Sequence, residues 1–115
     1  MKFSRRELAQ RATLTEPELE EVMRLRGPHN RLGFAYQLGF VRLLNRLPAQ
    51  MPFEVFDDLV LFTALQLRLD PSLIEKPRSR RSALALLRHV SPIEWENVVV
   101  YGEYRLDRRR IRQAR

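Results

Sequence analysis

The sequence has no cysteine and only two histidines among its 115 residues, and this scarcity removes several classes of site. Without thiols the chain can form neither a disulfide nor a thiolate metal site, and it has no cysteine nucleophile. It also lacks a glycine-rich phosphate loop, a Gly-x-Ser-x-Gly elbow and a His-Glu-x-x-His metal motif. We therefore expect no metal, no cofactor and no small-molecule substrate.

Long apolar runs are missing as well. No stretch approaches the roughly 20 apolar residues that a membrane-spanning helix requires. The amino terminus, Met1 to Leu8, contains charged residues from its second position and lacks the apolar core of a signal peptide. The sequence therefore predicts a cytoplasmic protein without a membrane partner.

Paired carboxylates, which metal-dependent catalysis needs, are scarce too. Asp57 and Asp58 form the one pair of adjacent aspartates, and neighbouring residues on a helix point about 100° apart, so the two cannot jointly bind one ion. Most other acidic residues are explained as helix caps or first-turn charges. These residues do not predict an enzyme.

What is present is the composition of a folded protein of one domain's size. Hydrophobic residues make up 44% of the chain and charged residues 30%, which permits a modest buried core. The net charge of +7 lies entirely in the carboxy-terminal part: residues 1–75 balance ten basic against ten acidic side chains, and residues 76–115 hold eleven against four. An arginine excess favours nucleic acid, although a basic end can also be only a solvated tail.

Helix-start patterns divide the chain into short helical segments. Capping-box spacing occurs at Ser4 with Glu7, at Thr15 with Glu18 and at Ser91 with Glu94. The first two pairs predict helices over residues 5–11 and 16–25, the second of which ends at Gly27-Pro28.

A third helix is expected from a cap at Asn30 to about Leu47, and it should be the core helix. One of its faces is apolar, while on the other three arginines recur at helical spacing. Such a stripe could lie along phosphates or could keep an outer face soluble. The apolar face consists of Leu32, Tyr36, Phe40, Leu43 and Leu47, and the outer face of Arg31, Ala35, Leu38, Arg42 and Arg46.

A fourth helix is expected to begin at Pro52, with Asp57 and Asp58 near its start, and to pack against the third. Asp70-Pro71 predicts a short turn. Further along, the pattern indicates a linker, two more helices and a basic tail. The prediction is an all-α bundle of several helices with short loops and a basic carboxy-terminal tail. These last segments cover residues 76–81, 82–90, 92–99 and 108–115.

Residues 26–38, Arg-Gly-Pro-His-Asn-Arg-Leu-Gly-Phe-Ala-Tyr-Gln-Leu, resemble an Arg-Gly-x-x-Asn-Arg-Leu-Gly-x-Ala-x-Gln signature in the amino-terminal region of Tn-three family transposases. The similarity runs from about Phe3 to Glu75. In that family this helical region binds the transposon's terminal inverted repeats, and a distant Asp-Asp-Glu site cleaves and joins DNA.

Residues 89–97 and 102–104 are similar to the last few dozen residues of the same transposases, a Ser-Pro-x-x-Trp-Glu-x-Ile segment followed by Gly-x-Tyr. The resemblance thus implies an internally deleted transposase, in which no acidic residue inherits a catalytic role. Its expected parts are residues 1–75, a truncated DNA-binding region; residues 76–81, a junction; and residues 82–115, a remnant of the carboxy-terminal tail.

The predicted function is binding of transposon inverted repeats without catalysis. Asn30 is ambiguous, because capping a helix would occupy its side chain. The alternative is a non-catalytic interaction protein, or an inert relic, that pairs with full-length transposase. The expected DNA contacts are Arg24, Arg26, His29, Asn30, Arg31 and Arg42.

Overall fold

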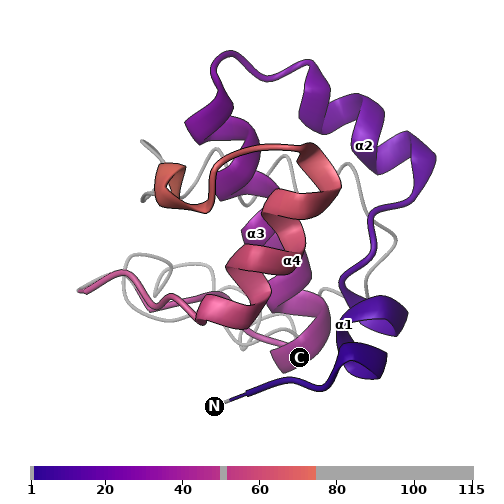
Figure 1. Ribbon diagram of the computed structural model, residues 1–115, viewed down its shortest axis with the longest axis vertical. Coiled ribbons are helices and arrows are strands. Elements are labelled where there is room, and N and C mark those ends of the chain that lie inside the picture. Colours follow the sequence, from indigo (N-terminus) through magenta and orange to yellow (C-terminus); the bar gives the residue numbers. More distant parts are fainter. Residues whose placement is uncertain (1, 50–51, 75–115) are drawn as a thin grey trace, which may run out of the picture.

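The computed structural model describes residues 2–49 and 52–74, and in these ranges the fold is all-α, as predicted. Four α-helices and one short 3-10 helix, η1 (Pro71–Leu73), follow one another without a β-strand in the described part. The central helix α3 contacts each of the other helices. Figure 1 shows α4 lying across α3, with α1 and α2 at opposite ends of the same side.

The first two helices begin where their capping boxes predict. In α1 (Arg5–Arg11) the Ser4 hydroxyl accepts a hydrogen bond from the Glu7 amide, and the Glu7 carboxylate accepts one from the Ser4 amide. Thr15 and Glu18 make the same reciprocal pair at the start of α2 (Glu16–Met23). Helix α2 ends two residues before the predicted position.

Helix α3 (Pro28–Leu44) begins earlier and ends earlier than expected. Its N-cap is Gly27 at φ 82°, a conformation that favours glycine, and Pro28 occupies the first turn, where a missing N–H costs nothing. Asn30 is therefore not the cap: its side chain lies inside the first turn and donates to the Arg26 carbonyl at 2.7 Å. At the other end Asn45 adopts the left-handed conformation and stops the helix.

The expected outer face of α3 does not exist, because the helix is buried all round from Leu32 to Val41. Two apolar clusters cover opposite sides of it, one containing Leu38 and the other Phe40. Gly39 allows α3 to lie close to its neighbours, because a Cβ at this position would lie 3.3 Å from the side chains of both Ala12 and Leu59. Ala35 and Leu38, which sequence periodicity assigns to solvent, are core residues.

Helix α4 (Asp57–Leu67) packs against α3 as predicted but begins five residues later than Pro52. The preceding residues are held extended by the Tyr36 hydroxyl, which donates to the Glu54 carbonyl at 2.8 Å and accepts from the Phe56 amide at 3.0 Å. Asp58 accepts a hydrogen bond from the Phe3 amide and so ties the amino-terminal segment to α4.

One buried side chain has no hydrogen-bond partner among the described residues. Gln37, in the middle of α3, is 1% exposed, and within residues 2–49 and 52–74 nothing pairs with its amide oxygen or its amide nitrogen. A buried unsatisfied amide costs about 1 to 3 kcal/mol relative to a satisfied one. The other buried polar or charged side chains of the described residues are Glu18 of α2 and Thr63 of α4, whose hydroxyl donates to the Leu59 carbonyl.

The short turn at Asp70-Pro71 is confirmed as η1, with the Asp70 carboxylate accepting from the Ser72 amide. The expected linker, carboxy-terminal helices and basic tail, residues 76–115, lie outside the described residues. Within the described ranges, no helix has the length and apolar character needed to cross a bilayer.

Candidate nucleic-acid interface

Five of the six predicted contact residues lie together at the junction of α2 and α3. Arg24 follows α2, its side chain is 71% exposed, and it forms an ion pair with Glu21 at 2.9 Å. Arg26 is also exposed. These two guanidinium groups are therefore the accessible cations of this junction.

The other three residues of the junction are half-buried, and two of them hold the turn in shape. Arg31 donates through Nε to the Leu25 carbonyl at 2.9 Å, and Asn30 donates to the Arg26 carbonyl. The His29 ring lies so close to Gly27 that a Cβ there would be 3.1 Å from its Cε1. Their first role is thus to build the turn that presents Arg24 and Arg26.

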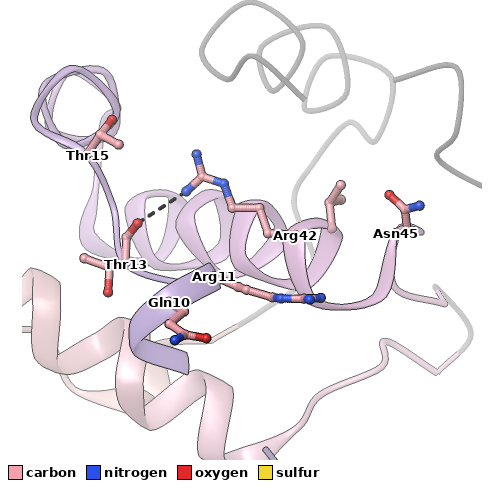
Figure 2. A pocket seen from close by; sticks show the side chains of 7 residues that line it. Gln10, Arg11, Thr13, Thr15, Arg42 and Asn45 are labelled. Atoms are coloured by element: carbon pink, nitrogen blue, oxygen red, sulfur yellow. Dashed lines mark hydrogen bonds between the residues drawn. The ribbon is translucent and has the colours of Figure 1, made fainter. Parts of the chain in front are cut away.

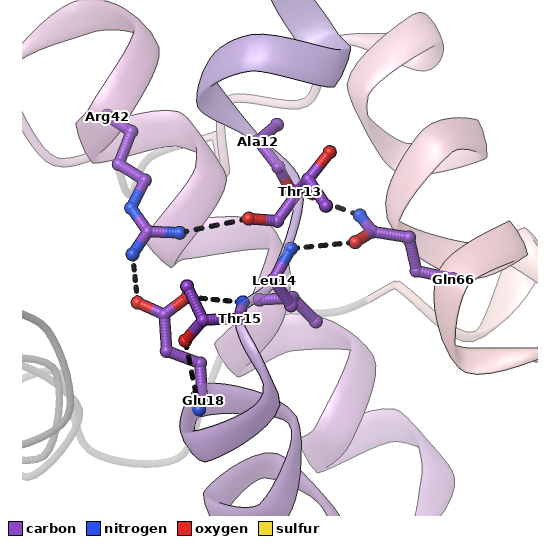
Figure 3. A network of polar contacts seen from close by, with 7 residues as sticks. All are labelled: Ala12, Thr13, Leu14, Thr15, Glu18, Arg42 and Gln66. Carbon is purple, nitrogen blue, oxygen red and sulfur yellow. Dashed lines mark hydrogen bonds and ion pairs between the residues drawn. The ribbon is translucent and has the colours of Figure 1, made fainter.

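Arg42, the sixth predicted residue, lies far from the junction, at the other end of α3. It is eleven positions after Arg31, which corresponds to about 16 Å along the helix axis. Figure 3 shows its guanidinium directed at the α1–α2 linker, where it pairs with Glu18 and contacts the Thr13 carbonyl. The side chain of Glu18 is 1% exposed and that of Arg42 17% exposed.

The Glu18 carboxylate stays ionised despite its burial. Burial, the largest influence, raises its pKa, but hydrogen bonds from Arg42 and Thr15 together with the charge of Arg42 outweigh it, and the pKa of Glu18 lies below its ordinary value. The pair therefore fastens α2 to α3 as a buried ion pair.

Arg46, which the sequence groups with Arg31 and Arg42, is engaged as well. Its guanidinium donates to both carboxylate oxygens of Glu54, at 2.6 and 2.8 Å, and lies 5.0 Å from the centre of the Phe40 ring. The hydrogen bond from Arg46 is the largest influence that lowers the pKa of Glu54. The predicted stripe is thus three arginines with three separate structural partners.

Exposed cations occur instead around α1 at the amino terminus, a segment that the sequence patterns did not single out. We call Lys2, Arg5, Arg6 and Arg11 the α1 basic surface; all four are exposed. The single acidic residue among them, Glu7, is occupied by the capping box. The charge neutrality of residues 1–75 hides this surface, because four glutamates in α2 offset it; a shorter charge window would have found it.

A groove of 460 Å³ lies beside this surface, between the end of α1, the α1–α2 linker and the end of α3. Figure 2 shows the Arg11 side chain extended along α3 toward Asn45, while Arg42 points to Thr13 on the other side. Five of the seven lining residues are uncharged, and two are arginines; no acidic residue is among them. The lining residues are Gln10, Arg11, Thr13, Thr15, Val41, Arg42 and Asn45.

The described residues bring together no group of three metal-ligating side chains. Asp57 and Asp58 begin α4, and Asp58 accepts hydrogen bonds from the amides of Phe3 and Leu59. These carboxylates therefore serve the structure at the helix start.

A comparison with known families gives a match that covers most of the chain. A domain family described as a domain of unknown function, DUF4158, matches residues 1–93, which include every described residue. The match continues through residues 76–81, so the division of the chain at that segment stays a prediction. No curated protein and no solved structure matches the chain.

Proposed function

We propose that this chain, which belongs to the DUF4158 family, binds DNA as a truncated transposase in the cytoplasm, with transposon inverted repeats as its preferred target. Three points support the proposal. Residues 26–38 resemble the transposase signature, domains of this family occur in Tn-three family transposases, and the described residues carry exposed arginines on two surfaces.

The α1 basic surface is the observation that carries the proposal. Its four cations are exposed, and none of them has an ion pair with an acidic residue of the described chain. Cations placed in this way attract phosphates, and each phosphate contact releases condensed counterions from DNA. The junction residues Arg24 and Arg26 lie at the other end of α3, so exposed arginines occur in two separate places.

We expect the two surfaces to make different kinds of contact with DNA. Phosphate contacts give affinity without sequence information, whereas base contacts need side chains in a fixed geometry. Arg26 follows α2 on a turn held by Asn30 and Arg31, so it is the better placed to read a base. The α1 basic surface would then supply affinity for any duplex.

This proposal predicts salt-dependent binding of purified protein to labelled inverted-repeat DNA in a mobility-shift assay. Arg26→Ala should narrow the preference for the repeat over random DNA by about 1 to 3 kcal/mol, since it removes a base contact. Arg5→Ala should weaken both complexes about equally. Equal affinity of the unaltered protein for both DNAs would contradict specific recognition.

The same reactions test the proposed lack of catalysis. In Tn-three family transposases the Asp-Asp-Glu site lies in a part of the chain that we propose is deleted here. We therefore expect neither cleavage nor joining of the labelled DNA in magnesium or manganese. Nicking of the DNA that is lost when Asp57 or Asp58 is changed would contradict the proposed lack of catalysis.

A second candidate function is pairing with full-length transposase. Leu61 and Leu65 of α4 are 52% and 77% exposed and lie one helical turn apart. Two exposed leucines on one side of a helix favour contact with another protein, and a stable interface would need further residues around them. Binding to the transposase that is lost in a Leu61→Ser, Leu65→Ser variant, without DNA binding by the chain alone, would favour this candidate.

A further inference from the structure

We propose that the groove between α1 and the end of α3 is a binding site for a backbone phosphate of duplex DNA. This inference rests on the proposed function and assigns its phosphate contact to a defined place, which the sequence did not indicate. Unused hydrogen-bond donors line the groove, and hydrogen bonds hold its walls in place.

The groove offers several hydrogen-bond donors that the fold does not use. The Arg11 guanidinium and the side-chain amides of Gln10 and Asn45 make no hydrogen bond or ion pair within the described residues. Thr15 accepts from the Glu18 amide, which leaves its hydroxyl hydrogen available. One cation with neutral donors around it is the kind of site that binds a phosphate oxygen.

The acidic residue that pairs with a lining side chain does not oppose an anion in the groove. Glu18 pairs with Arg42 behind the wall, and its side chain is 1% exposed. Its charge is neutralised by Arg42, and its oxygens also accept from the Thr15 amide. The groove surface therefore carries the positive charge of Arg11 without an exposed carboxylate among its lining residues.

The walls of the groove are fixed before any ligand binds. Gln66 of α4 donates to the Ala12 carbonyl at 3.1 Å and accepts from the Leu14 amide at 2.8 Å. Figure 3 shows this clamp on one side of the linker and Arg42 on the other. A site whose walls do not have to become ordered on binding loses less free energy to ordering.

The surroundings of the groove suit a phosphate that is part of a continuing strand. The groove is open to solvent on one side and lies at the end of α1. Arg6 is four residues before Gln10 and so shares its side of α1, which extends the positive charge away from the groove. A DNA backbone that leaves the groove along α1 meets this second cation.

The test compares two variants that change the net charge equally. Gln10→Glu places a carboxylate in the groove, and Ala9→Glu places one on an adjacent exposed position of α1 outside it. Binding of the full chain to a fluorescent duplex is measured by anisotropy over a salt series. We expect Gln10→Glu to weaken binding about tenfold more than Ala9→Glu.

A second pair of variants removes a cation instead of adding an anion. Arg11→Gln should weaken binding and reduce the salt dependence by about one counterion, whereas Arg68→Asn, at an exposed left-handed position after α4, should have a smaller effect. Circular dichroism checks that each variant is folded.

The outcomes separate this inference from the proposed function. If the unaltered chain binds no duplex, the proposed function is wrong and the groove has no DNA to bind. If it binds, but both members of each pair weaken binding equally, DNA binding stands and the groove is not its phosphate site.

Discussion

Replacing Phe40 by alanine should lower the free energy of unfolding by about 3 to 5 kcal/mol, among the larger losses that a single core substitution causes. Phe40 is fully buried at the centre of one apolar cluster. Its ring stacks on Phe56 at 5.6 Å between centroids and contacts Tyr36 at 5.9 Å, while the Arg46 guanidinium lies over it. Few neighbours can move to fill the space, so a cavity remains. Urea denaturation followed by circular dichroism measures the loss.

Two further substitutions serve as comparisons for Phe40→Ala. Leu43 shares the predicted apolar face but is only partly buried, so Leu43→Ala should cost less. Leu65 is 77% exposed, and Leu65→Ala should change the stability by no more than about 0.5 kcal/mol. A cost for Phe40→Ala as small as that of Leu65→Ala would mean that α3 packs with a different face.

Arg42→Met is the second substitution for which we expect a large loss, about 3 to 5 kcal/mol at neutral pH. The cost arises because Glu18 keeps its carboxylate, 1% exposed, but loses the ion pair that compensates its burial. Changing both residues, in a Glu18→Met, Arg42→Met variant, should recover most of the loss, because no buried charge is then left unpaired. A double variant as unstable as the single one would assign the loss to packing.

The pH dependence of stability gives an independent check on the same pair. In the unaltered chain the pKa of Glu18 is below its ordinary value of 4.5, so the stabilisation is present above about pH 4.5 and is lost as the pH falls through the folded-state pKa. In Arg42→Met, burial, which raises the pKa of the carboxyl, is opposed only by the hydrogen bonds with Thr15, so the pKa of Glu18 is higher than in the unaltered chain and its protonation at low pH costs less stability. The difference in stability between the two proteins should therefore shrink from pH 7 to pH 4.

The parts of the fold that sequence predicts well are those decided by local contacts. The capping boxes at Ser4 and Thr15 act over three residues, and both helix starts are where the pattern places them. The start of α3 was missed because two local signals compete: Asn30 resembles a cap, but Gly27 with Pro28 stops α2 and also begins α3. Here the conformational freedom of glycine and the fixed φ of proline decide the boundary.

Which arginines form ion pairs and which face solvent could not be predicted, because the pairs join residues that are distant in sequence. Glu18 and Arg42 are 24 residues apart, and no periodicity joins them. Likewise, the burial of Leu38 follows from a second apolar layer, formed with Val22 and Ala64, that closes over the side expected to face solvent. The sequence signature located the junction of α2 and α3, but which of its cations face solvent required the structure.

The all-round burial of α3 also has a consequence for how the molecule opens. A surface helix can fray from its solvent side, whereas the residues from Leu32 to Val41 have no such side. Their amide hydrogens can reach water only when α1, α2 or α4 detaches, so their exchange with solvent should report the stability of the whole unit. The seven residues of α1 cover only part of α3 and should exchange through smaller openings.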